Sequence, residues 1–324
     1  MSVYNGERWL HDSINSVLKQ TYSDFEFIIV NDGSLDKSLD IIKEFAGKDQ
    51  RILVIDKPNS GLADSLNVGI AKASGEWIAR IDADDLCDPN RLALQYGMAR
   101  SRTDLVLIGT GLLEIDDLGQ RRKTFSYPHG HQELVNRLLK MRAFFPHSSA
   151  FFNTQAVKNL GCYRPRLKRA QDFDLWLRLS EVGRIGCVAE PLVCIRHHAA
   201  QISHDEGGRR QIIDGRVALA SHFLRQKGLL DPVAVDSTYS DFTVFWQFVE
   251  SGVEQDKLVE FRRYIGNLKA KRDMAHFSGV IALLLFSVRS PHFLFRYFKE
   301  VFFGDQLASS LANAWSSRNA TCAA

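Results

Sequence analysis

A short apolar segment that runs directly into three aspartates is the feature that most constrains this chain. Residues 77–81 are typical of a buried strand, and Asp82, Asp84 and Asp85 follow at its carboxyl end. Carboxylates at such a position lose hydration, so they need a positive partner. In an open α/β sheet this edge binds ligands, and two carboxylates one residue apart suit a hard divalent cation that holds a diphosphate. An isolated Asp-x-Asp is weak evidence, so the interpretation depends on the surrounding sequence.

The first two thirds of the chain alternate between strand and helix patterns. Strands are predicted at 25–30, 52–55, 77–81 and 105–108. Helices are predicted at about 10–18, 38–46 and 62–73, with a further helix in which Asp88 is the cap and Pro89 the first residue. This alternation predicts an α/β fold with a mostly parallel sheet covered by helices on both faces.

The pattern changes towards the carboxyl terminus, where residues 206–324 are predicted to form a helical extension after a first domain at 1–205. Its longest apolar run, Val280 to Phe286, is too short to cross a bilayer. Residues 277–303 combine bulky apolar side chains with nearby cations. Two interpretations stay open: this segment lies on a membrane surface, or it packs on the first domain as a lid.

Composition excludes several classes of protein. The 324 residues have a net charge of +3, which is too small to argue for nucleic acid as a partner. Five scattered cysteines without a Cys-x-x-Cys pair argue against a disulfide framework or a zinc site and fit a reducing cytosol. The chain opens without a signal-peptide pattern, so we expect an intracellular protein.

An ordered set of motifs surrounds the three aspartates. The set comprises Ser2-Val3-Tyr4-Asn5-Gly6-Glu7, Val30-Asn31-Asp32-Gly33-Ser34, Asn59-Ser60-Gly61, Asp82-Ala83-Asp84-Asp85, His147-Ser148-Ser149, Gln171-Asp172 and Arg196-His197-His198. In this order the motifs resemble those of the family 2 glycosyltransferases, which are inverting sugar-nucleotide enzymes of the GT-A fold. The resemblance extends over roughly residues 1–205. It implies a Rossmann-like GT-A domain followed by the helical extension.

The resemblance implies a nucleotide site built from several strand ends. Asp32 would accept a hydrogen bond from a base N–H, because a carboxylate is an acceptor only. Asn31 stands where many relatives have a second aspartate, which leaves open the side chain that recognises the base. Tyr4 and Asn5 would lie beside the nucleoside. The alternative for residues 31–34 is a plain Asx turn with Gly33 at positive φ.

The same resemblance implies a metal site. Asp82 would meet the ribose or the water shell of the metal, and Asp84 would ligate the Mg²⁺ or Mn²⁺ that bridges the two phosphates. His198 would lie near the phosphates and the metal as a further ligand. The alternative for His198 is a structural or solvated histidine.

Asp172 is the candidate general base, because inversion needs a group that deprotonates the attacking hydroxyl on the acceptor side of the sugar. Gln171 stands where relatives usually have Glu. The alternative for Asp172 is an N-terminal helix cap, since an apolar helix follows it. The segment from His147 to Ser149 is expected to shape the acceptor pocket.

These inferences predict an inverting, metal-dependent transferase for cell-surface polysaccharide synthesis. It would move a sugar from a UDP- or dTDP-sugar donor to a glycan or lipid-linked acceptor, in the cytoplasm at the inner face of the cell membrane. Two alternatives are a catalytically degenerate membrane scaffold, which would be expected to lack Asp84 or Asp172, and a phosphatase with an Asp-x-Asp nucleophile. A phosphatase would carry that motif on its first strand.

The amino terminus departs from the family pattern. In relatives, a hydrophobic strand of about five residues precedes the Tyr-Asn-Gly element and lies in the middle of the sheet. Here only Met1, Ser2 and Val3 precede it. A missing central strand would expose backbone groups on its two neighbours. We therefore expect Met1 to be an internal methionine of a longer natural chain.

Overall fold

The computed structural model describes residues 1–198, 209–234, 239–255 and 306–322. The chain divides into two compact units. The first comprises Met1–Leu138 and Ala143–Arg209, and the second comprises Leu139–Arg142 and Arg210–Ala324. The segment 277–303, for which a membrane-surface and a lid interpretation stay open, lies outside the described residues.

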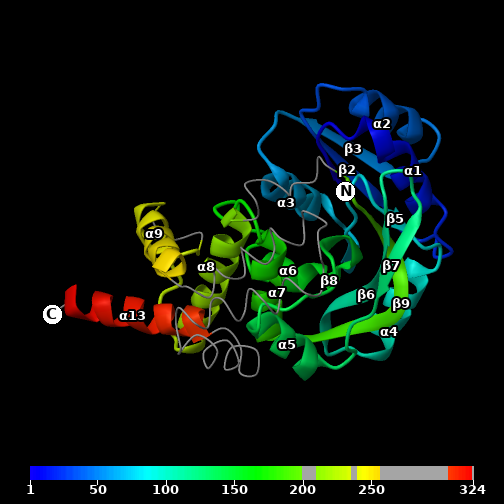
Figure 1. Ribbon diagram of the computed structural model, residues 1–324. Helices are drawn as coiled ribbons and strands as arrows, with labels where there is room; N and C mark the ends of the chain where they lie inside the picture. The colour runs from blue at the N-terminus through cyan, green and yellow to red at the C-terminus, as the bar shows by residue number, and fades with distance from the viewer. Residues whose placement is uncertain (199–208, 235–238, 256–305, 323–324) are drawn as a thin grey trace, which may run out of the picture. The chain divides into compact units, whose positions relative to one another are not determined.

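A three-stranded parallel sheet opens the first unit (Figure 1). Its order is β1 (Ser2–Val3), β2 (Phe27–Asp32) and β3 (Ile52–Lys57). The helices around it are α1 (Glu7–Leu18), α2 (Ser38–Ala46) and α3 (Leu62–Lys72). Each lies where the sequence predicts a helix, because apolar residues recur on one side of each segment.

The two faces of β2 separate these helices. Phe27 and Ile29 point to the core that α1 and α2 build. Ile28 and Val30 alternate with them and lie against α3, where Gly69 lets the helix approach both side chains. Helices on both faces bury five of the six residues of β2, and this explains its continuous apolar sequence.

A second sheet has mixed strand directions. Its order is β4 (Trp77–Ala79), β8 (Phe151–Asn153), β6 (Leu105–Ile115), β9 (Arg184–Arg196) and β5 (Leu86–Cys87), with β7 (Arg121–Phe125) paired to β6. Among the described strands of this sheet, the β6–β9 pairing alone is parallel. The predicted parallel arrangement therefore describes the first sheet, whereas the second is joined mainly by antiparallel pairs.

Short helices fill the rest of the first unit. They are α4 (Arg91–Ser101), α5 (His131–Leu139), the 3₁₀ turn η1 (His147–Ser149), α6 (Thr154–Asn159) and α7 (Gln171–Val182). The prediction that α4 starts at Asp88-Pro89 is wrong, because the helix begins at Arg91. Asp88 instead accepts a hydrogen bond from the N–H of Asn90, and the carbonyl of Pro89 accepts one from Thr21.

The second unit is helical over its described residues. It contains α8 (Arg209–Gln226), α9 (Tyr239–Gln255) and α13 (Gln306–Cys322). Helices α9 and α13 pack together through Phe245 and Trp315, whose ring centroids are 5.0 Å apart. Among the described helices, none is both long enough and apolar enough to span a bilayer.

Candidate active site

The three aspartates form a loop directly after β4. Each of Asp82, Asp84 and Asp85 offers a carboxylate oxygen within 4.8 Å of the other two. Asp82 and Asp84 are partly exposed, whereas Asp85 is buried. We call residues 82–85 the aspartate loop. Its geometry confirms that the chain gathers carboxylates at the end of this strand.

A buried arginine partly balances the charge of this loop. Arg80 is 4% exposed and forms an ion pair with Asp82 through both terminal guanidinium nitrogens. Burial alone would raise the pKa of Asp82, but the nearby Arg80 outweighs burial and lowers it. Asp82 is therefore ionised and held in one orientation.

Ser148, in the turn η1, joins the loop to its surroundings. Its buried hydroxyl accepts hydrogen bonds from the Asp82 N–H and from Arg80, both at 3.1 Å. The same hydroxyl contacts carboxylate oxygens of Asp82 and Asp85 and can donate to one of them. The segment from His147 to Ser149 thus supports the aspartate loop through its serine.

Asp85 connects this loop to the end of β9. One of its oxygens accepts the backbone N–H of Arg196 at 2.9 Å, two residues before His198. Burial, together with the charges of Asp84 and Asp82, raises its pKa well above the ordinary value. Asp85 therefore positions the histidine segment relative to the loop.

Asp84 and His198 lie together, as the sequence analysis expects for two ligands of one metal. The His198 Nε2 is 2.8 Å from an Asp84 oxygen, and its ring lies 4.1 Å from that of Trp9, centroid to centroid. Burial and the charge of Asp82 raise the pKa of Asp84. A divalent cation would relieve this repulsion, and carboxylate oxygens with one imidazole form a donor set suited to Mn²⁺ or Mg²⁺. The residues present therefore fit the metal.

The loop after β1 places Tyr4 and Asn5 at the carboxyl end of the parallel strands of the first sheet, where β2 also ends. Asn5 adopts a positive φ of 51°, and its side-chain oxygen accepts a hydrogen bond from the Leu35 N–H at 2.8 Å. Its own N–H donates to Ser34. Tyr4 is 53% exposed, so its ring face is available to a ligand. Asn5 thus joins two loops that flank the predicted nucleoside position.

Asn31 and Asp32 end β2 and are both buried. Asn31 donates to Asp56 at 2.7 Å. Asp32 forms an ion pair with Lys57 and accepts hydrogen bonds from the N–H groups of Ser60 and Gly61. Burial opposes ionisation of Asp32, but Lys57 and the backbone donors lower its pKa. Asp32 therefore anchors the 58–61 loop, a role that the sequence analysis missed because Lys57 lies outside the motifs.

Asp172 lies in the first turn of α7 and is partly exposed. It is not the N-cap, because that position belongs to Ala170. Burial raises the pKa of Asp172, and the charge of Asp82 adds to this effect, whereas the Phe173 N–H and Arg80 oppose it. Asp172 thus lies within electrostatic range of the aspartate loop and has the raised pKa that suits a general base.

A neutral histidine lies in the same part of the unit. The His147 Nε2 is 2.6 Å from the hydroxyl of the buried Tyr163, and its ring meets Trp176 edge-on. Burial and the charge of Arg80 lower the pKa of His147 well below its ordinary value. Arg80 therefore acts on Asp82, Asp172 and His147 together, although its position within the strand gave no clear sign of this in the sequence.

The arrangement of the chain is similar to that of known GT-A transferases. S. aureus TarS 1–349, solved in complex with UDP-GlcNAc, superposes with a TM-score of 0.57 at 20% sequence identity. The match covers 69% of this chain and 65% of that chain. At this identity the likeness defines the fold, which is GT-A.

Sequence comparison identifies the family. The model of Glycosyl transferase family 2 matches residues 1–161. The putative glycosyltransferase EpsE of Bacillus subtilis (strain 168) is 36% identical over 56% of this chain and 66% of EpsE, so the chain spans just under two thirds of that relative. The O-antigen biosynthesis glycosyltransferase WbnJ of Escherichia coli is 32% identical over 55% of this chain and 69% of WbnJ. The chain belongs to the family 2 glycosyltransferases.

Proposed function

We propose that this protein is an inverting, metal-dependent glycosyltransferase that takes a sugar from a UDP- or dTDP-sugar donor. The observation that supports this best is that the first unit contains both an acidic pair suited to a metal ion and a separate carboxylate suited to act as a base. Asp82 and Asp84 form an acidic pair with His198 beside it, and Asp172 lies within electrostatic range with a raised pKa. The first set suits a cation that holds a diphosphate, and the second suits a base.

In this proposal each residue has one task. Tyr4 and Asn5 hold the nucleoside beside the ends of β1 and β2, where Asn31 and Asp32 shape the base site. Asp84 and His198 would hold Mg²⁺ or Mn²⁺, which would supply positive charge to stabilise the leaving diphosphate.

The protein's own chemistry centres on Asp172. Its ionised carboxylate takes the proton from the acceptor hydroxyl as that oxygen attacks the anomeric carbon. The bond from that carbon to the diphosphate oxygen breaks on the opposite face, so the configuration inverts. Arg80 keeps Asp82 ionised and oriented, and the raised pKa makes Asp172 a stronger base than an exposed aspartate.

The acceptor and the cellular role are also proposals. We infer a glycan or lipid-linked acceptor in cell-surface polysaccharide synthesis, at the inner face of the cell membrane, with WbnJ's role in O-antigen biosynthesis as support. The phosphatase alternative is disfavoured, because the aspartate loop follows the fourth strand of the chain rather than the first.

The test is a panel of nucleotide sugars, including UDP-, dTDP- and GDP-sugars, incubated with the full chain and Mn²⁺. We expect release of the nucleoside diphosphate from a UDP- or dTDP-sugar, and loss of this release with a chelator. Activity that survives the chelator would contradict the metal assignment, and exclusive use of a GDP-sugar would contradict the donor class.

Substitutions then separate binding from chemistry. Asp172→Asn should lower kcat by about 10²-fold or more and leave donor affinity nearly unchanged, because it removes basicity but keeps size. Asp84→Asn should instead abolish metal-dependent nucleotide binding. Asp40→Asn, an exposed carboxylate on α2, is the matched control and should change neither quantity. An Asp172→Asn enzyme with normal kcat would rule out this base.

A further inference from the structure

Helix α1 carries two neighbouring stripes of side chains. The first stripe is buried in the core and consists of Leu10, Ile14 and Val17. The residues at positions 9, 13 and 16 lie on the adjacent side, because each residue turns the helix by about 100°. The Ser13 hydroxyl donates to the Asp82 carbonyl at 3.1 Å, and the Ser16 hydroxyl accepts the Cys87 N–H at 3.1 Å. This second stripe therefore faces the segment that contains the aspartate loop.

Trp9 is the first member of the second stripe, and its ring lies against His198. The two ring centroids are 4.1 Å apart, and the ring planes are inclined by 33°. Two guanidinium groups lie near the indole ring, that of Arg8 at 4.7 Å and that of Arg196 at 5.8 Å from its centroid. Both of these groups also donate hydrogen bonds to Asp117. Trp9 is therefore held by cation–π contacts with cations that are themselves anchored.

One ring nitrogen of His198 is without a hydrogen bond. Its Nε2 lies 2.8 Å from an Asp84 oxygen, whereas its Nδ1 is buried and has no partner among the residues that the structure describes. The His198 side chain is only 8% exposed. A histidine that ligates a metal usually donates its second N–H to a carboxylate or a carbonyl, which fixes the plane of the ring. At His198 the indole ring of Trp9 is in a position to do this instead.

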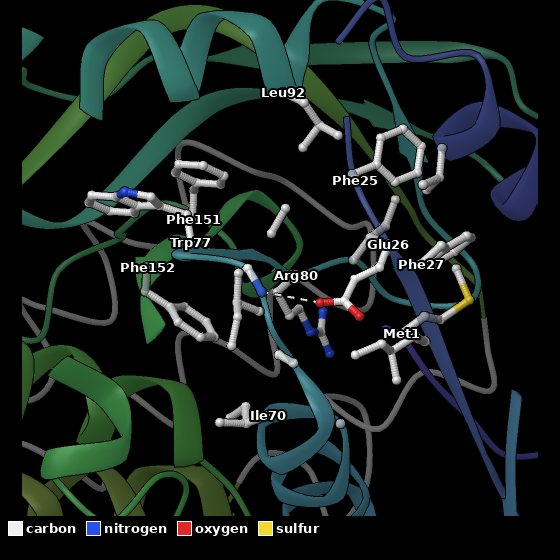
Figure 2. Close-up of a pocket in the computed structure, with 18 of the residues that line it drawn as sticks. Met1, Phe25, Glu26, Phe27, Ile70, Trp77, Arg80, Leu92, Phe151 and Phe152 are labelled. Carbon is white, nitrogen blue, oxygen red and sulfur yellow. Dashed lines mark hydrogen bonds between the residues drawn. The ribbon is translucent and has the colours of Figure 1, made fainter. Parts of the chain in front are cut away.

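The carboxylates of Asp82 and Asp84 are held in different ways. Asp82 is bound by Ser148 and by Arg80, which Figure 2 shows among the side chains around a cavity of about 600 Å³. The Asp84 carboxylate has His198 as its side-chain partner. The orientation of the His198 ring therefore affects both candidate metal ligands, whereas Asp82 is held independently of it.

We propose that Trp9 is the positioning residue of the candidate metal site. Its indole ring sets the plane of the His198 imidazole and thereby directs Nε2 and the Asp84 carboxylate towards one cation. This inference rests on the proposed function, in which these two residues hold Mg²⁺ or Mn²⁺. Without the indole ring the imidazole can tilt, and fixing it again when the cation binds costs affinity.

The first test follows the His198 ring by NMR in the full chain without metal or nucleotide. Protons that lie over the face of an indole ring resonate upfield, and the His198 signal is assigned by its loss in His198→Ala. We expect an upfield position in the unchanged chain, a downfield shift in Trp9→Leu, and a smaller shift in Trp9→Phe, which keeps an aromatic ring. An unchanged signal in Trp9→Leu would overturn the proposal, whatever the metal does.

The second test measures Mn²⁺ affinity by calorimetric titration in the presence of UDP. Trp9→Leu should lower this affinity by about tenfold or more, as is usual for groups that orient metal ligands. Trp9→Phe should retain most of the affinity. Phe25→Leu is the matched control, because Phe25 is also a half-buried ring with an arginine near it, Arg51 at 4.5 Å, and it precedes the amino end of β2. This control should leave the affinity unchanged.

The same substitution in a His198→Ala background separates positioning of the histidine from a general effect. Trp9→Leu should then change Mn²⁺ affinity by less than about twofold, because the ring has no imidazole to orient. Equal losses in both backgrounds would overturn the proposal and leave the proposed function intact. If the unchanged chain binds no Mn²⁺ in the presence of UDP, the metal assignment fails and the proposal fails with it.

Discussion

Ser148 shows how a single hydroxyl can determine the shape of the candidate site. It is fully buried and contacts the Asp82 N–H, Arg80 and two carboxylates, so it fixes the backbone and the charges of the aspartate loop together. Groups of this kind, which orient ligands without touching the substrate, usually matter almost as much as the ligands.

Replacement of Ser148 by Ala should therefore lower both nucleotide affinity and stability, because one hydroxyl makes several contacts in the aspartate loop. We expect metal-dependent nucleotide affinity to fall by roughly tenfold or more, and stability to fall by about 1–3 kcal/mol because buried polar groups lose their partner. Calorimetric titration with UDP and Mn²⁺ measures the first effect. Ser149→Ala is the control, since that buried hydroxyl donates to the Pro146 carbonyl, away from the aspartates. Equal losses in both variants would contradict a specific role for Ser148.

The raised pKa of Asp172 predicts the pH dependence of catalysis. Burial is its main cause, and the base is active only when ionised, so kcat should fall as pH drops through a value above the ordinary 3.8. Measurement of kcat at saturating donor and metal, from about pH 4 to 8, gives this midpoint. Donor affinity over the same range separates it from titration of the aspartate loop. A midpoint at or below the ordinary value would argue against Asp172 as the base.

At the residue scale, the sequence predicted the candidate metal ligands better than the side chains that contact the site residues. The pairing of Asp82 with Asp84 was visible because the two residues are neighbours in the sequence, whereas His198, 114 residues from Asp84, was expected there from the family resemblance. The contacts of Arg80 with Ser148 and of Asp32 with Lys57 depend on pairing between segments 25 to 68 residues apart, which local patterns do not encode.

At the scale of elements, helices were predicted well and the longest strands poorly. Helix α2 has the predicted bounds, 38–46, because its apolar spacing and its sheet contact agree. Strand β9 extends over 13 residues and was not predicted, although it pairs with most of β6. Its sequence contains Pro191 and a stretch of exposed residues, and its pairing with β6 shifts register near this point. Long-range pairing thus stabilises a segment whose own pattern is weak.

The short β1 leads to a prediction about pH and stability. Burial and the charge of Arg80 lower the pKa of the Met1 amine to about 5 in the folded chain, below the ordinary value of 8.0, so the unfolded state binds more protons between these values. Stability should therefore rise from pH 5 to 8, by at most about 1.4 kcal/mol per pH unit. Urea unfolding at several pH values measures the slope. The N-acetylated chain is the control and should have a smaller slope; equal slopes would show that Met1 does not titrate in this way.

At the scale of the whole molecule, membrane association of the carboxyl-terminal region remains a prediction. Helix α13 packs on α9, so deletion of the tail would also remove part of the second unit. Charge reversal is a cleaner change: Arg289→Glu, Arg296→Glu and Lys299→Glu together should abolish flotation with anionic liposomes at low salt, since each cation near such a surface contributes about 1 kcal/mol.

The control for this experiment reverses three exposed cations of the first unit, Lys43, Lys72 and Arg100. It changes net charge equally and should leave flotation intact. If the unchanged protein stays at the bottom of the gradient, or if both triple variants float equally well, the tail is not a membrane anchor.

The ion pair between Arg80 and Asp82 has a consequence for the uptake of metal. Since Arg80 cancels one carboxylate, the ionised aspartate loop has two uncompensated negative charges, equal in size to the charge of one divalent cation. The remaining carboxylates, Asp84 and Asp85, have raised pKa values and therefore retain protons to a higher pH than ordinary aspartates. A cation that binds at the proposed metal site would displace any protons that these carboxylates hold. Binding would then release hydrogen ions and weaken as the pH falls towards the raised pKa values.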